Sequence, residues 1–298
     1  MSPSRRRSAV HELQVKFEVS ERRACKVVGQ PRSSQRSESN PRDDECSLVR
    51  RMLQLVHKFP RYGVRRIAAL LRRESWRASA TRIYRLWRRE GLKVPQKKQK
   101  RRRLGNSTNG CHRHCAQHRN HVWCWDFAFD HTSSGSTLKW FSVVDEFTRE
   151  NLTLKVDRNI TSEDVIDALA ELFVVYGVPK HIRSDNGPEF IAEAIRRWFE
   201  QLDIKALYIE PGSPWENGYA ESFFSRFRDE FLALEEFENL KSARKLTKAW
   251  REDYNHHRPH SSLGYLPPVE FAAHCASSVR AAPSLRKHSD ESEVTLIP

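Results

Sequence analysis

Residues 122–209 alternate between strand-like and helix-like hydrophobic patterns, and this alternation constrains the fold more than any other feature of the chain. The pattern predicts three strands, a helix, a strand, a helix and a strand, at about 122–129, 138–145, 150–156, 162–176, 179–183, 191–201 and 207–209. Strands that alternate with helices in this way are typical of a mixed sheet flanked by helices. The sequence therefore predicts an α/β domain in this part of the chain.

Three acidic residues, Asp126, Asp185 and Glu221, stand in segments that are otherwise apolar or turn-forming. Asp126 projects from the first expected strand, and Asp185 follows the short fourth strand in a Ser-Asp-Asn-Gly turn, at the expected carboxyl rim of the sheet. Taken singly, each is explained equally well as a strand-edge charge, a turn residue or a solvated helix glutamate. Together, three carboxylates can hold two divalent cations for phosphoryl transfer on nucleic acid. The set predicts a DNA-processing enzyme.

Glu221 belongs to a segment that begins with loop residues and continues as a helix. An i, i+4, i+7 spacing places four residues on one face of this helix, namely Asn217, Glu221, Ser225 and Arg228. A carboxylate followed two turns later by a guanidinium presents a metal ligand beside a group that holds phosphates. We therefore expect Arg228 to act beside the acidic residues, and Asn217 to contact DNA.

Five segments carry a resemblance to a known family. They are residues 125–127 (Trp-Asp-Phe), 144–149 (Val-Asp-Glu-Phe-Thr-Arg), 184–190 (Ser-Asp-Asn-Gly-Pro-Glu-Phe), 214–223 (Pro-Trp-Glu-Asn-Gly-Tyr-Ala-Glu-Ser-Phe) and 254–265 (Tyr-Asn-His-His-Arg-Pro-His-Ser-Ser-Leu-Gly-Tyr). In these motifs the chain resembles the catalytic core of retroviral integrases. More closely, it resembles bacterial insertion-sequence transposases of the IS-three family, whose second reading frame encodes the product known as OrfB. The resemblance covers most of residues 10–272.

The resemblance implies a ribonuclease-H-like α/β catalytic core preceded by an all-α helix-turn-helix region. It implies that Asp126, Asp185 and Glu221 bind two Mg²⁺ or Mn²⁺ ions, and that Arg228, where relatives carry Lys or Arg, contacts DNA. The implied enzyme is a DDE-type transposase. Such an enzyme nicks the donor ends of an insertion sequence and transfers them to target DNA by two-metal phosphoryl transfer, without a covalent protein–DNA intermediate.

The net charge of +14 comes entirely from the N-terminal part of the chain. Residues 1–110 hold 30 Lys and Arg against 9 Asp and Glu, whereas residues 111–298 hold 22 against 29. Because neutralisation of phosphates supplies most sequence-independent affinity for DNA, this asymmetry indicates a basic DNA-binding half joined to an acidic catalytic half. A solvated surface explains a single charge run, but it explains poorly a surplus of this size interleaved with aromatic residues.

Two helical units are expected in the basic half. In residues 9–34, Ser20 is expected to cap a short helix that Gly29 ends, and residues 31–34 to follow as a linker. Residues 47–93 contain three apolar stripes with one basic face, which is typical of a helix-turn-helix domain. The first of these stripes consists of Leu48, Met52, Leu53 and Val56.

The last helix of this domain is the expected recognition helix, because such helices offer their N-terminal residues to base edges. The residues expected to contact DNA there are Arg77, Thr81, Arg82 and Arg85. The turn before it contains Ser75, where relatives commonly have Gly. This departure from glycine disfavours a tight turn at Ser75.

A basic linker is expected after the helix-turn-helix domain. Its positive run could mimic a nuclear-import signal, but we interpret it as a phosphate-binding segment, made of Lys97, Lys98, Lys100, Arg101, Arg102 and Arg103. Thiols and imidazoles follow at Cys111, His112, His114, Cys115, His118 and His121. Their spacing does not match a standard zinc finger, so we favour a hydrated His-rich linker over a zinc site.

Six cysteines in 298 residues do not make a disulfide framework, and no apolar segment has the length of a signal peptide or a membrane span. A cytoplasmic, nucleoid-associated bacterial protein is therefore expected. The expected parts are an N-terminal helical DNA-binding segment, the helix-turn-helix domain, the basic linker, the catalytic core and a disordered tail, over residues 1–46, 47–93, 94–117, 118–272 and 273–298.

Two alternatives to a transposase remain open. In the first, the chain is a DNA-binding regulator or a partner subunit that is inactive without fusion to the upstream-frame product. In the second, it is a metal-dependent nuclease that cuts DNA without joining it. The basic half favours a transposase over a general nuclease. A transposase would take double-stranded DNA as both element ends and target, and bringing two ends together implies a homo-oligomer.

Overall fold

The computed structural model describes residues 3–37, 43–94, 115–184, 193–208 and 218–281. The chain divides into two compact units, residues 1–53 and 54–298, and helix α4 (Glu45–Lys58) spans the boundary between them. Among the described residues, no helix is long and apolar enough to cross a membrane.

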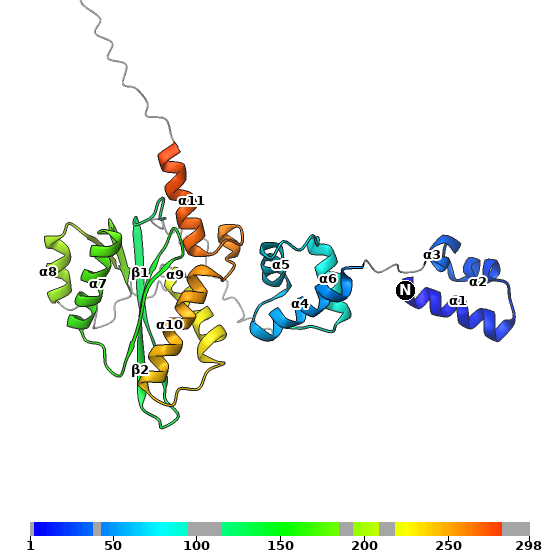
Figure 1. Ribbon diagram of the computed structural model, residues 1–298, viewed down its shortest axis with the longest axis horizontal. Coiled ribbons are helices and arrows are strands. Elements are labelled where there is room, and N and C mark those ends of the chain that lie inside the picture. The colour runs from blue at the N-terminus through cyan, green and yellow to red at the C-terminus, as the bar shows by residue number, and fades with distance from the viewer. Residues whose placement is uncertain (1–2, 38–42, 95–114, 185–192, 209–217, 282–298) are drawn as a thin grey trace, which may run out of the picture. The chain divides into compact units, whose positions relative to one another are not determined.

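The first unit contains helices α1 (Pro3–Phe17), α2 (Glu21–Val28) and α3 (Arg32–Arg36) around a small core of Val10, Ala24 and Cys25 (Figure 1). The expected cap is confirmed, because the Ser20 hydroxyl accepts a hydrogen bond from the backbone N–H of Arg23. The expected stop at Gly29 is also confirmed, since this residue has a φ of 67°, in the left-handed region that glycine favours.

The linker expected at residues 31–34 is wrong, because this segment enters helix α3. Pro31 precedes the first helical residue, and its carbonyl accepts the backbone N–H of Gln35. The Glu21 carboxylate pairs with both Arg32 (3.1 Å) and Arg36 (2.9 Å), which lie one turn apart. These two ion pairs tie the short helix to the start of α2, a long-range contact that a linker-like sequence does not announce.

Helices α5 (Val64–Arg73) and α6 (Ala80–Arg89) follow α4 in the basic half. In α4 the buried stripe is Leu48, Met52 and Leu55, at i, i+4 and i+7. Leu53, which we expected in this stripe, is 40% exposed, so that part of the expectation is wrong. The turn between α5 and α6 contains Ser75 at a φ of 64°, so the chain adopts there a left-handed conformation that glycine favours.

The α/β domain expected from the sequence is built on a five-stranded sheet of order β3-β2-β1-β4-β5. The strands are β1 (Val122–His131), β2 (Thr137–Asp145), β3 (Asn151–Asp157), β4 (His181–Ser184) and β5 (Lys205–Tyr208). Strands β1, β2 and β3 pair in antiparallel fashion, whereas β4 and β5 run parallel to β1. This topology, a three-stranded meander extended by two parallel strands, is the expected ribonuclease-H-like arrangement.

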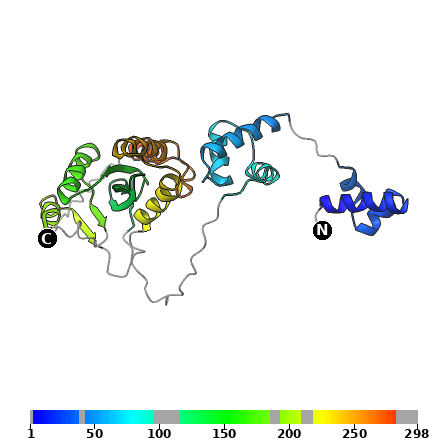
Figure 2. The same ribbon diagram turned by 90° about the horizontal axis from the view of Figure 1, so that it is seen from below.

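Helices cover both faces of this sheet (Figures 1 and 2). Helices α7 (Ser162–Tyr176) and α8 (Glu193–Gln201) lie on one face, and α9 (Gly218–Phe227) and α10 (Leu240–His256) lie on the other. Helix α7 has the expected bounds, because Thr161 and Asp164 form a capping box at its start and Gly177, at a φ of 85°, ends it.

The chain beyond α9 forms a π-helical turn (Arg228–Leu232), then α10, a 3₁₀ turn (Ser261–Leu263) and α11 (Pro268–Ala281). The disordered tail expected from residue 273 is therefore wrong as far as Ala281. The proline at the first position of α11 favours helix initiation, and the ring of Phe271 packs 5.8 Å from that of Phe147, which anchors the helix to the core. Residues 282–298 and 95–114 lie outside the described part of the chain.

Candidate active site

Asp126 lies on the central strand β1 and is half-buried. Alternate residues of a strand share one sheet face, so Asp126 faces the same way as Cys124 and Ala128. These two residues belong to the apolar core that the sheet forms with α9 and α10. One Asp126 carboxylate oxygen accepts the backbone N–H of Phe127 at 2.7 Å. The side chain is therefore directed to the α9 face of the sheet, as its place in the period-two pattern requires.

Glu221 lies in the first turn of α9 and is exposed. The same helix is fixed on the sheet by its apolar side, which consists of Ala220, Phe223, Phe224 and Phe227. Because α9 packs directly against β1, Glu221 and Asp126 come from two adjacent elements on one face of the sheet. Their carboxylate oxygens are the ligand type that Mg²⁺ and Mn²⁺ prefer.

Asp185, the third expected metal ligand, and Asn217 lie outside the described residues. Strand β4 ends at Ser184, the residue before Asp185, and pairs with β1 in a register that sets Arg183 beside Cys124. Arg183 is buried and forms an ion pair of 2.8 Å with the buried Glu146, at the end of β2. This pair ties the carboxyl end of β4 to the chain that follows β2, across the intervening strand β1.

Arg228, the expected phosphate contact, is exposed and is the first residue of the π-helical turn. The expected uninterrupted helix through Arg228 is therefore wrong, because α9 ends at Phe227. The Arg228 guanidinium lies over the ring of Phe224 at 5.9 Å, one turn earlier. A wider π turn inside a helix is frequent at functional sites, and here it accompanies the burial of Glu230.

Glu230 is held by two arginines, a cluster that the sequence did not reveal. Its carboxylate accepts hydrogen bonds from Arg258 (2.7 and 2.8 Å) and from Arg66 of α5 (2.8 Å). Burial alone would raise the pKa of Glu230, but the hydrogen bonds and charges of Arg258 and Arg66 outweigh it and lower the pKa below its ordinary value. Glu230 therefore stays ionised between the two guanidiniums.

The segment 254–265 is more buried than a polar loop. Tyr254, Asn255, Arg258 and His260 are buried, whereas His256 and His257 are exposed. Burial, together with the neighbouring arginines, lowers the pKa of His260 well below its usual range. His260 is thus neutral at physiological pH, and its Nε2 lies 3.2 Å from a guanidinium nitrogen of Arg258.

The expected DNA contacts of α6 are only partly exposed. The N-cap Ser79 accepts the backbone N–H of Arg82, while Ile83, Leu86 and Trp87 face the interior. Arg77, Thr81 and Arg85 are exposed, whereas Arg82 is half-buried. Three of the four residues are thus available at the surface of α6 and its preceding turn. The basic run from Lys97 to Arg103 lies outside the described residues.

The histidines of the interdomain segment have structural contacts where they are described. The rings of His118 and His121 stack with centroids 4.6 Å apart, and Nδ1 of His121 accepts the backbone N–H of Gln117. Cys111, His112 and His114 lie outside the described residues. Cys115 is exposed.

Family models match three parts of the chain: an HTH-like domain at residues 41–100, and an integrase core domain at residues 116–214 and again at 202–268. The chain is 40% identical over 266 residues to an uncharacterized 31.7 kDa protein of insertion element IS407 from Burkholderia multivorans, covering 89% of this chain and 94% of that protein. It is 28% identical to transposase InsD of insertion element IS2 from Escherichia coli, covering 76% and 79% of the two chains.

Among solved structures, the catalytic core domain of HTLV-2 integrase in complex with magnesium is 18% identical. The alignment covers 52% of this chain and 97% of that one, at a TM-score of 0.43. We base no conclusion on a structural similarity this low, and we assign the family from the sequence comparisons alone. The chain belongs to the integrase-core transposases of insertion sequences of the IS3 type, which are DDE-type polynucleotidyl transferases.

Proposed function

We propose that this transposase nicks the donor ends of its insertion sequence and transfers them to target DNA, using a site made of Asp126, Asp185 and Glu221. The observation that carries the proposal is that two of these carboxylates come from elements that pack against each other on one face of the sheet. Asp126 and Glu221 come from β1 and α9, which pack together on one face of the sheet. Asp185 directly follows the last residue of β4, the strand beside β1.

The carboxylates fit two Mg²⁺ or Mn²⁺ ions in the chemistry of their donor atoms, because hard divalent cations prefer carboxylate oxygens. When bound, such a pair activates the attacking water or 3′-hydroxyl and stabilises the leaving 3′-oxygen of an in-line displacement. The chain contributes orientation: the aromatic side of α9 fixes the helix, and the hydrogen bond from the Phe127 backbone holds the Asp126 carboxylate.

We propose that Arg228 contacts a DNA phosphate beside this site, while α6 and its preceding turn contact DNA through Arg77, Thr81 and Arg85. Exposure of these four side chains supports the proposal. Arg82, Asn217 and the basic residues 97–103 complete the proposed DNA contacts. A homo-oligomer that holds two DNA ends is the form in which strand transfer is expected.

Strand joining tests the proposal. Full-length protein is incubated with labelled linear DNA bearing the element's own ends, with and without Mg²⁺. We expect joined product that requires metal and disappears in Asp126→Asn. Asp130→Asn is the matched control, since Asp130 lies on the same face of the same strand, four residues further on, and hydrogen-bonds to the backbone of His131. Its joining activity is expected to stay near that of the wild type.

The other outcomes identify the alternatives. Cutting of the labelled DNA without joining would show a nuclease rather than a transposase. Specific binding with neither reaction would show a regulator, or a subunit that acts only when fused to the upstream-frame product. Equal losses in Asp126→Asn and Asp130→Asn would contradict the assignment of Asp126 as a metal ligand.

A further inference from the structure

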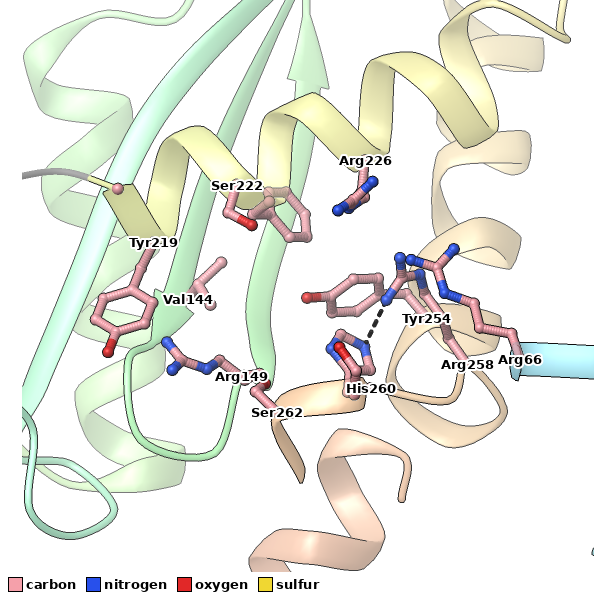
Figure 3. A pocket seen from close by; sticks show the side chains of 13 residues that line it. Arg66, Val144, Arg149, Tyr219, Ser222, Arg226, Tyr254, Arg258, His260 and Ser262 are labelled. Atoms are coloured by element: carbon pink, nitrogen blue, oxygen red, sulfur yellow. Dashed lines mark hydrogen bonds between the residues drawn. The ribbon is translucent and has the colours of Figure 1, made fainter. Parts of the chain in front are cut away.

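A pocket of about 320 Å³ is lined by helix α9, the turn after β2, the segment after α10 and Arg66 of α5 (Figure 3). Four arginines line it, Arg66, Arg149, Arg226 and Arg258, and none of its lining residues is acidic. Among the described residues, Glu230 is the carboxylate that pairs with Arg66 and Arg258, and it is not part of the lining. Four guanidiniums against one carboxylate leave a surplus of three positive charges.

Arg149 is held in this pocket at an energetic disadvantage. Its φ of 63° is left-handed, which is unfavourable for a residue with a side chain. Its guanidinium lies 3.6 Å from the centroid of the Tyr219 ring, and its Nη1 atom is buried with no hydrogen-bond partner among the described residues. A buried donor without an acceptor is a further unfavourable feature.

The turn that carries Arg149 is closed by the carboxylate of Asp145. One Asp145 oxygen accepts the backbone N–H groups of Phe147 and Thr148, at 2.9 and 2.7 Å. The Asp145 carbonyl also accepts the backbone N–H of Arg149. The strained position is thus enforced by a built turn, and the unsatisfied donor points to an acceptor that enters from outside the chain.

Helix α9 supplies a second set of donors. Ser222 and Arg226 are one turn apart and both project towards the pocket (Figure 3). Arg226 is exposed and has no ion-pair partner among the described residues. Gly218 and Tyr219, at the N-terminus of the ten-residue helix, also line the pocket. Backbone N–H groups at such a terminus favour anions.

The ligand that fits is a phosphate group. Planar guanidiniums bind phosphate oxygens through two parallel hydrogen bonds, and several around one pocket suit a tetrahedral anion with several acceptor oxygens. His260, which also lines the pocket, is neutral, so the positive charge comes from the arginines. Successive helix residues differ by about 100°, which sets the pocket face of Ser222 and Arg226 next to the face that carries Glu221.

We propose that this pocket binds a backbone phosphate of the DNA substrate, held by Arg149 and Arg226, one face round α9 from the catalytic carboxylate Glu221. The inference rests on the proposed function in that DNA is the substrate. The pocket would thus provide a second phosphate contact, distinct from Arg228. Around the circumference of the helix, Arg228 lies on one side of Glu221 and the pocket residues lie on the other. Bound there, the phosphate would orient a DNA strand along α9.

The test is the salt dependence of DNA binding. Affinity of the full chain for a labelled duplex bearing the element's ends is measured over a series of chloride concentrations, in EDTA, so that neither metal nor catalysis enters. Each lost phosphate contact reduces the slope of log affinity against log salt by about 0.9. We expect this reduction in Arg226→Ala and in Arg149→Gly, whose glycine suits the positive φ.

The matched control is Arg158→Ala, which removes an exposed arginine between β3 and α7, outside the pocket lining. Its slope should equal that of the wild type. Thermal unfolding confirms that each variant is folded. Wild-type slopes in both folded pocket variants would overturn the proposal, and so would an equal reduction in Arg158→Ala.

Free phosphate is the alternative source of the same chemistry. Phosphate replaces chloride at matched ionic strength, and the melting temperature is compared between wild type and Arg226→Ala. Stabilisation of the wild type alone, with no change in the DNA slope, would overturn DNA as the occupant. The joining assay separates the two proposals. If the pocket variants have reduced slopes but the wild type joins no DNA, only the proposed function is refuted. If the pocket variants have wild-type slopes and the wild type joins DNA with metal, only the phosphate pocket is refuted.

Discussion

Replacing Glu230 by Gln is the perturbation with the largest expected effect on stability. The substitution keeps the shape of the side chain but removes its charge, and it leaves Arg258 and Arg66 facing a neutral amide. Glu230 and Arg258 have side chains only 6% and 4% exposed, and Arg66 is 21% exposed. Removing one partner of a buried pair generally destabilises by about 3–5 kcal/mol, because it leaves a buried charge uncompensated.

The expected value lies near the lower end of that range. Three hydrogen bonds reach the Glu230 carboxylate. A Gln side chain keeps one oxygen that accepts, so part of this network survives. The partly exposed Arg66 can also be hydrated. We therefore expect Glu230→Gln to lower the free energy of unfolding by about 3 kcal/mol at neutral pH.

Urea unfolding followed by tryptophan fluorescence measures this loss. The matched control is Asp229→Asn, on the same turn, since Asp229 is 3.9 Å from Arg61 and both side chains are about a quarter exposed. Such a pair contributes at most about 1 kcal/mol. A loss below that value in Glu230→Gln, or equal losses in the two variants, would refute the reasoning from burial.

The pH dependence gives a second, independent readout. The pKa of Glu230 is lowered from an ordinary value of 4.5, so its stabilisation is fully present above pH 4.5 and is lost as pH falls through the folded-state pKa. The stability difference between wild type and Glu230→Gln should therefore be constant above pH 4.5 and shrink below it. A difference that persists unchanged in acid would show that the lost charge is not its origin.

Three further experiments test individual structural features. Ser75→Gly relieves the φ of 64° and should raise the free energy of unfolding by about 0.5–1 kcal/mol; an unchanged or lower melting temperature would contradict it. Asn255→Ala removes a buried amide that accepts the backbone N–H of Asn151 and donates to the Asn151 carbonyl. It should lower the free energy of unfolding, measured in urea, by about 1–3 kcal/mol, whereas Asn159→Ala, at an exposed position, should leave it unchanged. Trp140→Phe and Thr247→Val each remove the buried hydrogen bond from Trp140 Nε1 to the Thr247 hydroxyl (2.9 Å). In a double-mutant cycle, the loss of unfolding free energy in the double variant should therefore be smaller than the sum of the two single losses, and additive losses would argue against this hydrogen bond.

Elements with local signals at both ends were predicted well from the sequence. Helix α7 has the expected bounds because Thr161 can cap it and Gly177 can end it, and both properties belong to the residues themselves. The choice between Leu53 and Leu55 in the stripe of α4 is different. Both are apolar and two positions apart, so only packing decides which of them is buried.

The same distinction applies to the site. Alternation along β1 was sufficient to place Asp126 on one face of the sheet, and helical spacing placed Glu221 on the surface of α9. The π-helical turn was not predictable, because the contacts of its Glu230 come from Arg258, 28 residues away, and from Arg66, 164 residues away. The arginine pocket likewise gathers side chains from separate segments, and no one segment shows by its own pattern that these side chains meet.

Helix α9 therefore has a different role on each of its three sides, and the turn that follows it has a fourth. Its aromatic side fixes it to the sheet, the next carries Glu221, and the third, with Ser222 and Arg226, faces the arginine pocket. At its end, Glu230 binds Arg66, a residue of the helix that precedes the proposed recognition helix. A rotation of α9 that moved Glu221 would also move the pocket face and strain the Glu230 ion pairs. The proposed catalytic carboxylate, the proposed phosphate pocket and the helix that carries Arg66 are thus connected through α9 and the turn that follows it, and the aromatic contacts of α9 hold this connection in place.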